Sequence, residues 1–263
     1  METIDISLWG MLAMYLILLL PIALMFWLGL GLIKDTIWAV FRMTLQLAFV
    51  GVYLKFIFEF NSLAINLLWI AVMVLTANWT ILKRANLSVK RMFPVTILSV
   101  AFSSAFVAAF LVVGVLKTSP SNARYIIPVF GMVLGNCMRG NVISLERFFS
   151  SIRENEMEFI TYQLLGASLV EAVRPYLKRA MRASISPYIS TMATMGIVSL
   201  PGMLTGQILG GSLPLTAIKY QIAIMICIFT SVFLASIINL LLSTRIAFDK
   251  SGMLRQSVFS ASQ

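Results

Sequence analysis

Long apolar runs divide the chain, and short polar segments separate them. Within each run the apolar residues are continuous instead of alternating, which indicates helices and not the strands of a membrane barrel. A helix needs about 20 apolar residues to cross the hydrocarbon core of a bilayer. The pattern predicts membrane-spanning helices over residues 8–33, 36–58, 63–82, 93–115, 124–146, 186–211 and 218–243. We therefore expect an all-α polytopic membrane protein with one transmembrane domain covering residues 1–263.

One segment between the fifth and sixth runs, about 147–185, is too polar to lie in lipid. Gly166 is a natural end for a first helix in this segment. Ser168 and Glu171 have the S-x-x-E spacing of a capping box, which predicts the start of a second short helix. Pro175 is expected to bend or restart that helix. The segment therefore reads as a helical hairpin outside the membrane.

The corner of this hairpin is rich in small side chains and could fit a groove on a partner protein. The small residues are Gly166, Ala167, Ser168 and Ala172. An alternative is an amphipathic helix that rests on anionic lipid, because Arg174, Lys178 and Arg182 share one helical face. Lipid binding would not explain the small-residue corner, so we favour a docking element.

The positive charges fall mainly in alternate loops, as expected for a membrane protein. With the N-terminus outside and the C-terminus inside, the inner loops hold most of the cations: Lys34, Lys83, Arg84, Lys90, Arg91, Arg147, Arg153, Arg174, Lys178, Arg179, Arg182, Arg245, Lys250 and Arg255. The acidic leader with Glu2 and Asp5 suits the outer side. The net charge of +10 thus reflects membrane topology, and we expect no nucleic-acid partner. The hydrophobic content of 60% indicates that the expected partner is the lipid bilayer.

Polar residues inside the expected spans are candidates for a transport pathway. Arg42 and Gln46 share a face of the second span, although we favour the reading in which Arg42 reaches the inner interface and Gln46 bonds a neighbouring helix. Asn136 and Arg139 lie within the fifth run, where Arg139 either faces a pathway or marks the inner end of the helix. Both readings of Arg139 stay open.

Two glycine patterns predict close helix packing. Gly131 and Gly135 form a small-xxx-small pair in the fifth span. In the sixth span Pro201 permits a kink, and the face that follows carries Gly202, Gly206 and Gly210. Gln207 and Thr205 are the polar groups beside that face. Met203 and other Met residues could be soft metal ligands, but the chain has 16 Met, so we favour packing and expect no metal site.

The sequence lacks residues and motifs that several classes of enzyme and carrier require. The sequence has no histidine and no G-x-x-x-x-G-K-[ST] phosphate loop, so we expect neither a Ser/His/Asp hydrolase nor an ATPase of that type. No Asp or Glu lies in the interior of an expected span, which disfavours a proton-coupled secondary carrier. We expect no catalytic residues and no cofactor in this chain.

Five ordered segments carry a family resemblance: R-x-x-x-QL-x-x-x-GVYLK-x-IF, IPVFGMVLGNCM, LLGAS-x-x-EA, VSLPGMLTGQILGG and AIKYQI. Together they resemble the small ABC-transporter permeases implicated in bacterial iron export and plant aluminium tolerance. The resemblance spans nearly the whole chain. It departs at Arg139, where a small or apolar residue is expected, and at Leu204, where the family pattern has a second Met.

The resemblance implies a bacterial inner-membrane permease that forms a homodimer and binds a separate ATP-binding subunit, which would hold ATP and Mg²⁺. It makes Gly166, Ala167, Ser168, Glu171 and Ala172 the ATPase-coupling corner. The implied activity is export of a metal such as iron, or of a related small solute. A membrane scaffold that recruits a cytoplasmic partner without transport is the alternative from another class.

Overall fold

A computed structural model describes residues 5–249 and 252–259, so Glu2 and Lys250, which we used for topology, lie outside the described residues. The described chain is helical apart from turns and isolated bridges. In order, its elements are α1 (Leu8–Leu16), α2 (Leu19–Trp27), α3 (Ile33–Phe60), α4 (Leu63–Arg84), α5 (Val89–Ala109), a π-helix (Phe110–Val115), α6 (Ala123–Glu154), α7 (Glu156–Leu164), α8 (Leu169–Thr194), α9 (Gly202–Leu209), α10 (Pro214–Ala247) and a short 3₁₀ helix (Gln256–Val258).

The described residues contain six helices or helix pairs that are long and apolar enough to cross a membrane. They are Leu8–Trp27, Ile33–Phe60, Leu63–Arg84, Val89–Val115, Ala123–Glu154 and Pro214–Ala247. Each corresponds to one predicted span, although α6 extends past residue 146 and the first span is divided between α1 and α2. Six of the seven predicted spans are therefore found by length and composition, and the protein is a multi-pass membrane protein.

The single helix predicted over 186–211 is wrong. That stretch begins inside α8, breaks after Thr194 and resumes as the eight-residue α9. Gly196 supplies a positive φ of 86° that other residues rarely adopt. A bridge between Met195 and Ser199 closes the turn. The break therefore divides the stretch into two helical parts, as in the discontinuous helices that line cavities in transporters.

Pro175 does not restart the helix as we expected. α8 continues through both Pro175 and Pro187, and its 26 residues span about 39 Å at 1.5 Å per residue. The second arm of the polar hairpin and the first half of the predicted sixth span are thus one continuous helix. The two prolines made this continuity hard to predict from the sequence.

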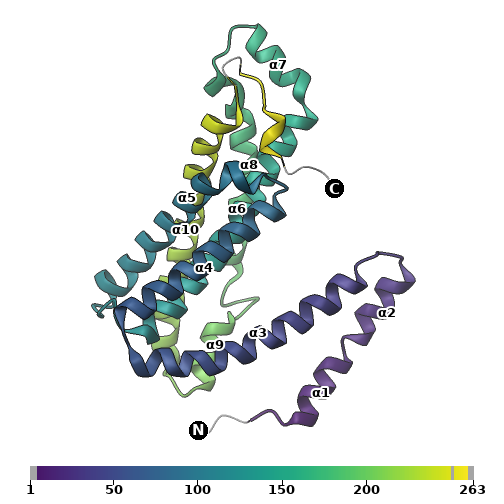
Figure 1. Cartoon of the computed structure of the whole chain (residues 1–263). Helices are drawn as coiled ribbons and strands as arrows, with labels where there is room; N and C mark the ends of the chain where they lie inside the picture. The colour runs from purple at the N-terminus through teal and green to yellow at the C-terminus, as the bar shows by residue number, and fades with distance from the viewer. Residues whose placement is uncertain (1–4, 250–251, 260–263) are drawn as a thin grey trace.

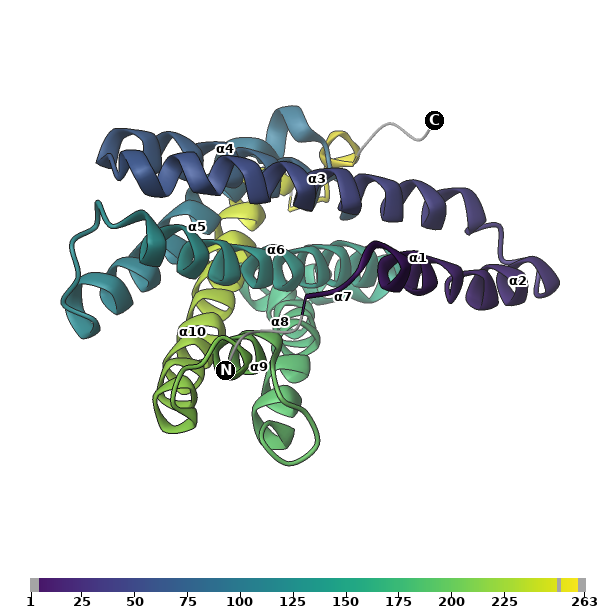
Figure 2. The same ribbon diagram turned by 90° about the horizontal axis from the view of Figure 1, so that it is seen from below.

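α6 is the central helix of the bundle. It packs against α4, α5, α8 and α10. Figure 2 shows α6 between the layer of α3 and α4 and the layer of α8, α9 and α10. Side chains on α6 therefore face several neighbouring helices at once.

The N-terminal helices extend away from this bundle (Figure 1). None of the described residues of α1 or α2 is buried, and Ile57 is the buried residue of α3. α1 is tied to α3 by a hydrogen bond of 2.7 Å between the hydroxyls of Tyr15 and Thr44. The far end of α3 packs on α4 through Tyr53 and Trp69, whose ring centroids are 4.1 Å apart.

A polar seam runs through the buried interface of α5, α6, α8 and α10. Asn239 donates through Nδ2 to Asn141 Oδ1 at 2.9 Å, and Ser184 Oγ donates to the Gly140 carbonyl at 2.9 Å. Thr96 Oγ1 lies 3.4 Å from Asn239 Oδ1. In an apolar interior these bonds fix how the helices face one another.

Candidate functional site

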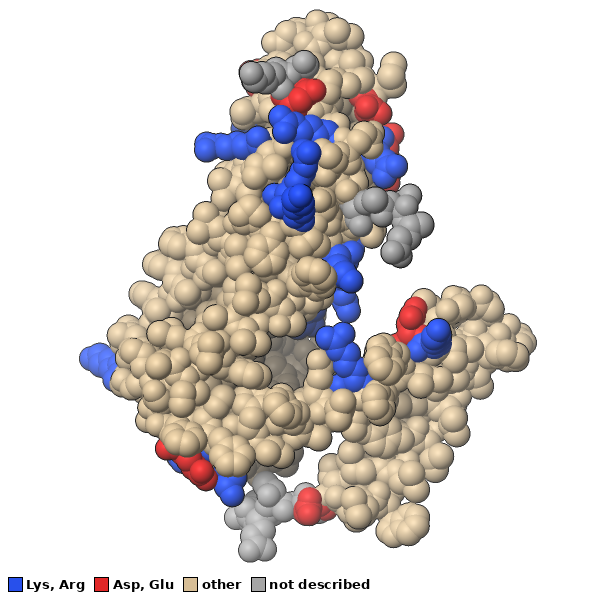
Figure 3. Space-filling view, in the orientation of Figure 1, with Lys and Arg blue, Asp and Glu red and all other residues tan. Residues whose placement is uncertain are grey.

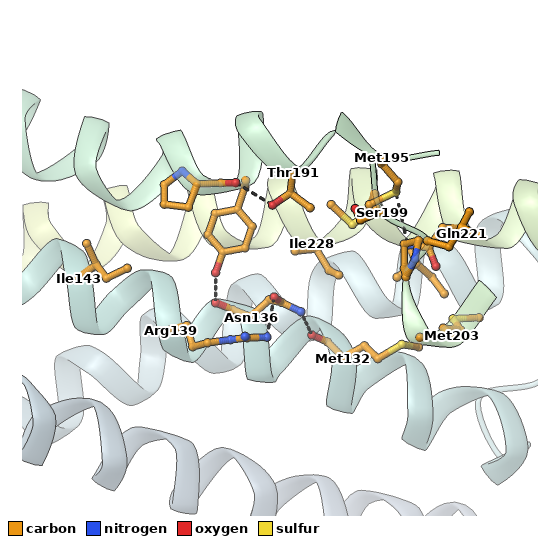
Figure 4. Close-up of a pocket in the computed structure, with 17 residues that line it drawn as sticks. Met132, Asn136, Arg139, Ile143, Thr191, Met195, Ser199, Met203, Gln221 and Ile228 are labelled. Carbon is orange, nitrogen blue, oxygen red and sulfur yellow. Dashed lines mark hydrogen bonds between the residues drawn. The ribbon is translucent and has the colours of Figure 1, made fainter. Parts of the chain in front are cut away.

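A cavity of about 560 Å³ opens between α6, α8, α10 and the break that precedes α9 (Figure 4). This volume is in the usual range for small-molecule sites. Its seventeen lining residues are Met132, Asn136, Arg139, Ile143, Pro187, Tyr188, Thr191, Met195, Ser199, Leu200, Pro201, Gly202, Met203, Gln221, Ile224, Met225 and Ile228. The non-helical segment between α8 and α9 thus forms part of the wall of the cavity.

One wall carries a hydrogen-bonded group of three side chains. Arg139 Nη2 donates to Asn136 Oδ1 at 3.0 Å, and Asn136 Nδ2 donates to the Met132 carbonyl at 2.8 Å. From α8, the Tyr188 hydroxyl donates to the Asn136 carbonyl at 2.7 Å. These bonds hold the guanidinium at the edge of the cavity, where the Arg139 side chain is still exposed.

Gln221 of α10 supplies the second polar group of the cavity. It is 6% exposed, and its Nε2 lies 3.8 Å from the Met195 sulfur. Its Oε1 is buried without a hydrogen-bond partner. A buried amide oxygen is normally bonded, so this acceptor is unsatisfied as placed, and rotation of the Gln221 side chain toward the cavity would let a ligand donor reach it.

The charge of the cavity is positive. Arg139 is the one charged residue among the seventeen that line it. The described residues also contain no group of three or more His, Cys, Asp or Glu that could hold a metal ion. Met132, Met195 and Met203 do line the cavity, as the alternative of a soft metal site requires. The same cavity is also lined by the positively charged Arg139.

Arg139 is near the middle of α6. Sixteen residues separate it from Ala123, about 24 Å along the helix. The hydrocarbon core is about 30 Å thick. With Ala123 at one membrane surface, Arg139 would lie about 6 Å from the other surface, within reach of a snorkelling side chain, so both readings of Arg139 stay open.

The polar hairpin forms one end of the molecule (Figure 1). α7 ends at Leu164, and Gly166 follows with a φ of 92° and open space where a Cβ would stand. Glycine at this position is the helix stop expected from the sequence, because a positive φ is costly for other residues.

The predicted capping box is present at the start of α8. Ser168 N and Oγ donate to Glu171 Oε2 at 2.8 and 2.7 Å, and Glu171 N donates back to Ser168 Oγ at 3.4 Å. The hydrogen bonds from the Ser168 hydroxyl and backbone lower the pKa of Glu171. Glu171 therefore stays ionised at neutral pH and keeps the corner closed.

Buried aromatic contacts fasten the hairpin to the rest of the protein. Phe159 of α7 is 2% exposed and packs on Tyr176 of α8 and on Phe248, with centroid distances of 6.1 and 5.5 Å. Gln163 Nε2 donates to the Gly252 carbonyl at 3.1 Å. Helix α7 is thus held between α8 and the C-terminal segment.

The hairpin exposes four large apolar side chains. We call this surface the apolar tip: Met157, Leu164, Leu165 and Val170, which are 77%, 82%, 80% and 74% exposed. Lys and Arg side chains form a band between this tip and the apolar middle of the molecule (Figure 3). The exposed basic residues near this end are Lys83, Arg84, Lys90, Arg91, Arg147, Arg153, Arg174, Lys178, Arg179 and Arg182.

The structure distributes the other candidate residues unevenly. Asn136, Arg139, Gly202 and Met203 meet at the cavity, whereas Gln207, Thr205, Gly206 and Gly210 are outside its lining. Arg42 and Gln46 are exposed on the extended part of α3. At the hairpin, Ala167 is half-buried and Ala172 is in the core, so Ala172 supports the corner from inside.

The predicted glycine faces make no close backbone contact within the protomer. A Cβ at Gly135, Gly202 or Gly206 would meet no atom within 4 Å, and one at Gly131 would meet Met73 Cε at 3.1 Å. Their packing role stays a prediction for a contact outside the protomer. On α6 the glycine packed tightly against other helices is Gly140, which the sequence analysis did not single out.

Ser168→Ala should weaken the start of α8 by about 1 kcal/mol, because it removes the N-cap acceptor. Hydrogen exchange of the first amides of α8 should quicken by about fivefold, the equivalent of that free energy. Ser168→Thr keeps a capping oxygen and serves as the control. Equal exchange in the Ala and Thr variants would show that the cap does not hold the corner.

A helical bundle of long apolar helices around a cavity defines a multi-pass membrane protein. The chain belongs to the uncharacterised protein family UPF0014, whose match covers residues 8–248. This finding confirms the family recognised from the sequence motifs.

Three relatives illustrate the range of the family. The chain is 38% identical to the UPF0014 membrane protein slr1647 of Synechocystis over 79% of this chain and 80% of the relative. It is 33% identical to the Arabidopsis protein ALUMINUM SENSITIVE 3, over 95% and 90%. It is 29% identical to the probable iron export permease protein FetB of Escherichia coli, over 82% of each. No solved structure matches the chain.

Proposed function

We propose that this protein is the transmembrane subunit of an ABC transporter, driven by a separate ATP-binding subunit that carries ATP and Mg²⁺. The observation that carries the proposal is the apolar tip, which lies beyond the band of basic residues. Positive side chains mark the lipid headgroups on the inner side of a membrane. Four exposed apolar side chains past that level would lie outside the lipid, which supports a protein partner at this surface.

α8 provides the mechanical link in this proposal. It begins at the Ser168 corner and reaches the cavity through Pro187, Tyr188 and Thr191. A force applied at the corner by closure of the ATP-binding subunits would move one wall of the cavity as a rigid rod. The break at Gly196 would let α9 move separately, so that the cavity opens to alternate sides.

In this proposal the chain acts as a homodimer in a bacterial inner membrane, with its N-terminus outside and its C-terminus inside. The broken α8–α9 stretch is the seventh crossing. The extended N-terminal helices and the open glycines of α6 and α9 are the surfaces for the second copy. Export of a metal such as iron, or of a small solute, is the activity suggested by the name of the relative FetB.

The test is reconstitution with a separate ATP-binding subunit; a gene for one beside the gene of this chain would supply the candidate. Proteoliposomes should show solute flux that needs both ATP and the partner, and the transported solute should stimulate ATP hydrolysis. Partner binding without flux of any solute would favour the scaffold alternative. Flux without nucleotide would indicate a secondary carrier and would contradict the proposal.

A further inference from the structure

We propose that the cavity between α6, α8 and α10 is a binding site for an oxyanion that carries hydroxyl groups, such as a hydroxylated carboxylate or phosphate compound, and not for a bare metal cation. The inference rests on the proposed transport role, because it names the class of solute that the pathway accepts. Two features of the cavity lead to it.

The first feature is the uncompensated charge. Arg139 is the one charged side chain of the lining. The nearest acid along its own helix, Glu146, is seven residues further on, about 10 Å along the helix axis, and is not among the lining residues. A guanidinium at the edge of a largely apolar cavity attracts carboxylate or phosphate, which it can bind through two parallel hydrogen bonds. It repels a bare cation.

The second feature is the buried amide of Gln221. Its Oε1 is fully enclosed and unbonded, while the side chain as a whole is 6% exposed. An acceptor in this state is matched by a ligand that brings an O–H or N–H donor. Thr191 and Ser199 add hydroxyls to the same lining. The cavity therefore offers an anion-binding group and an acceptor for hydroxyls.

The geometry keeps Arg139 in place without neutralising it. Its partner Asn136 is neutral, and Asn136 is in turn fixed by Tyr188 from α8. Asn136 thus links the anion-binding side chain to the same rod that carries the hairpin. Movement of α8 would shift the guanidinium and so change the affinity for an anion during a transport cycle.

The experiment measures binding to the purified full chain without the ATP-binding subunit. Citrate is the probe, and propane-1,2,3-tricarboxylate, which lacks its hydroxyl, is the matched analogue. Calorimetry should show citrate binding that Arg139→Gln weakens by about tenfold or more, the loss expected for one charged hydrogen bond. Arg147→Gln, on the exposed face of the same helix, should bind citrate as the parent does.

Gln221→Leu tests the second feature. It should weaken citrate binding and leave the binding of propane-1,2,3-tricarboxylate unchanged. An equal effect on both compounds would overturn the role of Gln221. Thermal unfolding of each variant in detergent checks that it remains folded.

An anionic lipid headgroup offers the same chemistry as a soluble oxyanion. Nanodiscs of phosphatidylglycerol and of phosphatidylcholine separate the two sources. Stabilisation by phosphatidylglycerol that disappears in Arg139→Gln, without citrate binding, would assign the cavity to lipid and still support an oxyanion site. Binding of Mn²⁺ or Ag⁺ that Arg139→Gln leaves unchanged, with neither anion bound, would overturn the proposal.

The outcome is independent of the proposed coupling. If the ATP-binding subunit co-purifies and drives transport while no anion binds at the cavity, the anion site is wrong and the permease proposal stands. If anion binding depends on Arg139 but no ATP-binding subunit associates, the anion site stands and the permease proposal is wrong.

Discussion

Replacing Leu164 and Leu165 together by Asp should abolish co-purification of the ATP-binding subunit and reduce ATP-dependent transport to background. Both side chains are about four-fifths exposed, so the protein loses no core contact. The expected loss comes from two carboxylates placed where an apolar patch should be buried against the partner, since desolvating unpaired charges is costly. Pull-down and transport by the reconstituted pair are the measurements.

The control for this prediction is Leu164→Met with Leu165→Met, which keeps an apolar surface and should retain the partner. Gly166→Arg and Glu171→Arg should also uncouple the complex. These two substitutions would also disturb the local fold, because Gly166 has a positive φ and Glu171 forms part of the capping box. Normal partner binding by the double Asp variant would show that the apolar tip is not the docking surface.

The sequence predicted the parts of the fold that depend on local chemistry. The apolar runs predicted seven membrane spans, six of which the described residues contain, and the S-x-x-E spacing at Ser168 predicted the capping box that the structure contains. Gly166 ends its helix as expected. These features depend on residues within a few positions of one another, and so a single sequence suffices to recognise them.

Features that depend on distant contacts were missed. The break after Thr194 was read as a kink at Pro201, because an apolar sequence such as Ile197–Leu200 fits either a helix or an extended turn. The continuity of α8 through Pro175 was missed for the opposite reason. Proline usually disturbs a helix, but packing against α6 and α10 holds this one.

The candidate site was predicted only on α6 and at the start of α9. Asn136, Arg139 and Met203 were singled out because polar or soft groups in an apolar run stand out. Tyr188 and Gln221 join them only through the packing of α8 and α10 on α6. Gln221 lies in the AIKYQI motif that carried the family resemblance, and that motif was the one available signal for it.

Gly140→Ala should lower the free energy of unfolding by about 1–3 kcal/mol, the usual cost of overpacking an interior. An added Cβ would collide with Val232 of α10 and would lie 3.2 Å from Ser184 Oγ of α8. α6 would have to move away from both helices. Because Arg139 is the preceding residue, the same movement should weaken anion binding in the cavity.

Gly135→Ala, five residues earlier on the same helix, is the matched control, since a Cβ there meets no atom within 4 Å. Alanine favours a helix over glycine by about 0.5–1 kcal/mol, so this variant should be as stable as the parent or slightly more stable. Thermal unfolding in detergent, followed by circular dichroism, gives the comparison. Equal stability of the two variants would show that α6, α8 and α10 do not pack as closely at Gly140 as the structure has them. A less stable Gly135→Ala variant would place the close contact of α6 at Gly135, where a second copy of the chain would have to supply it.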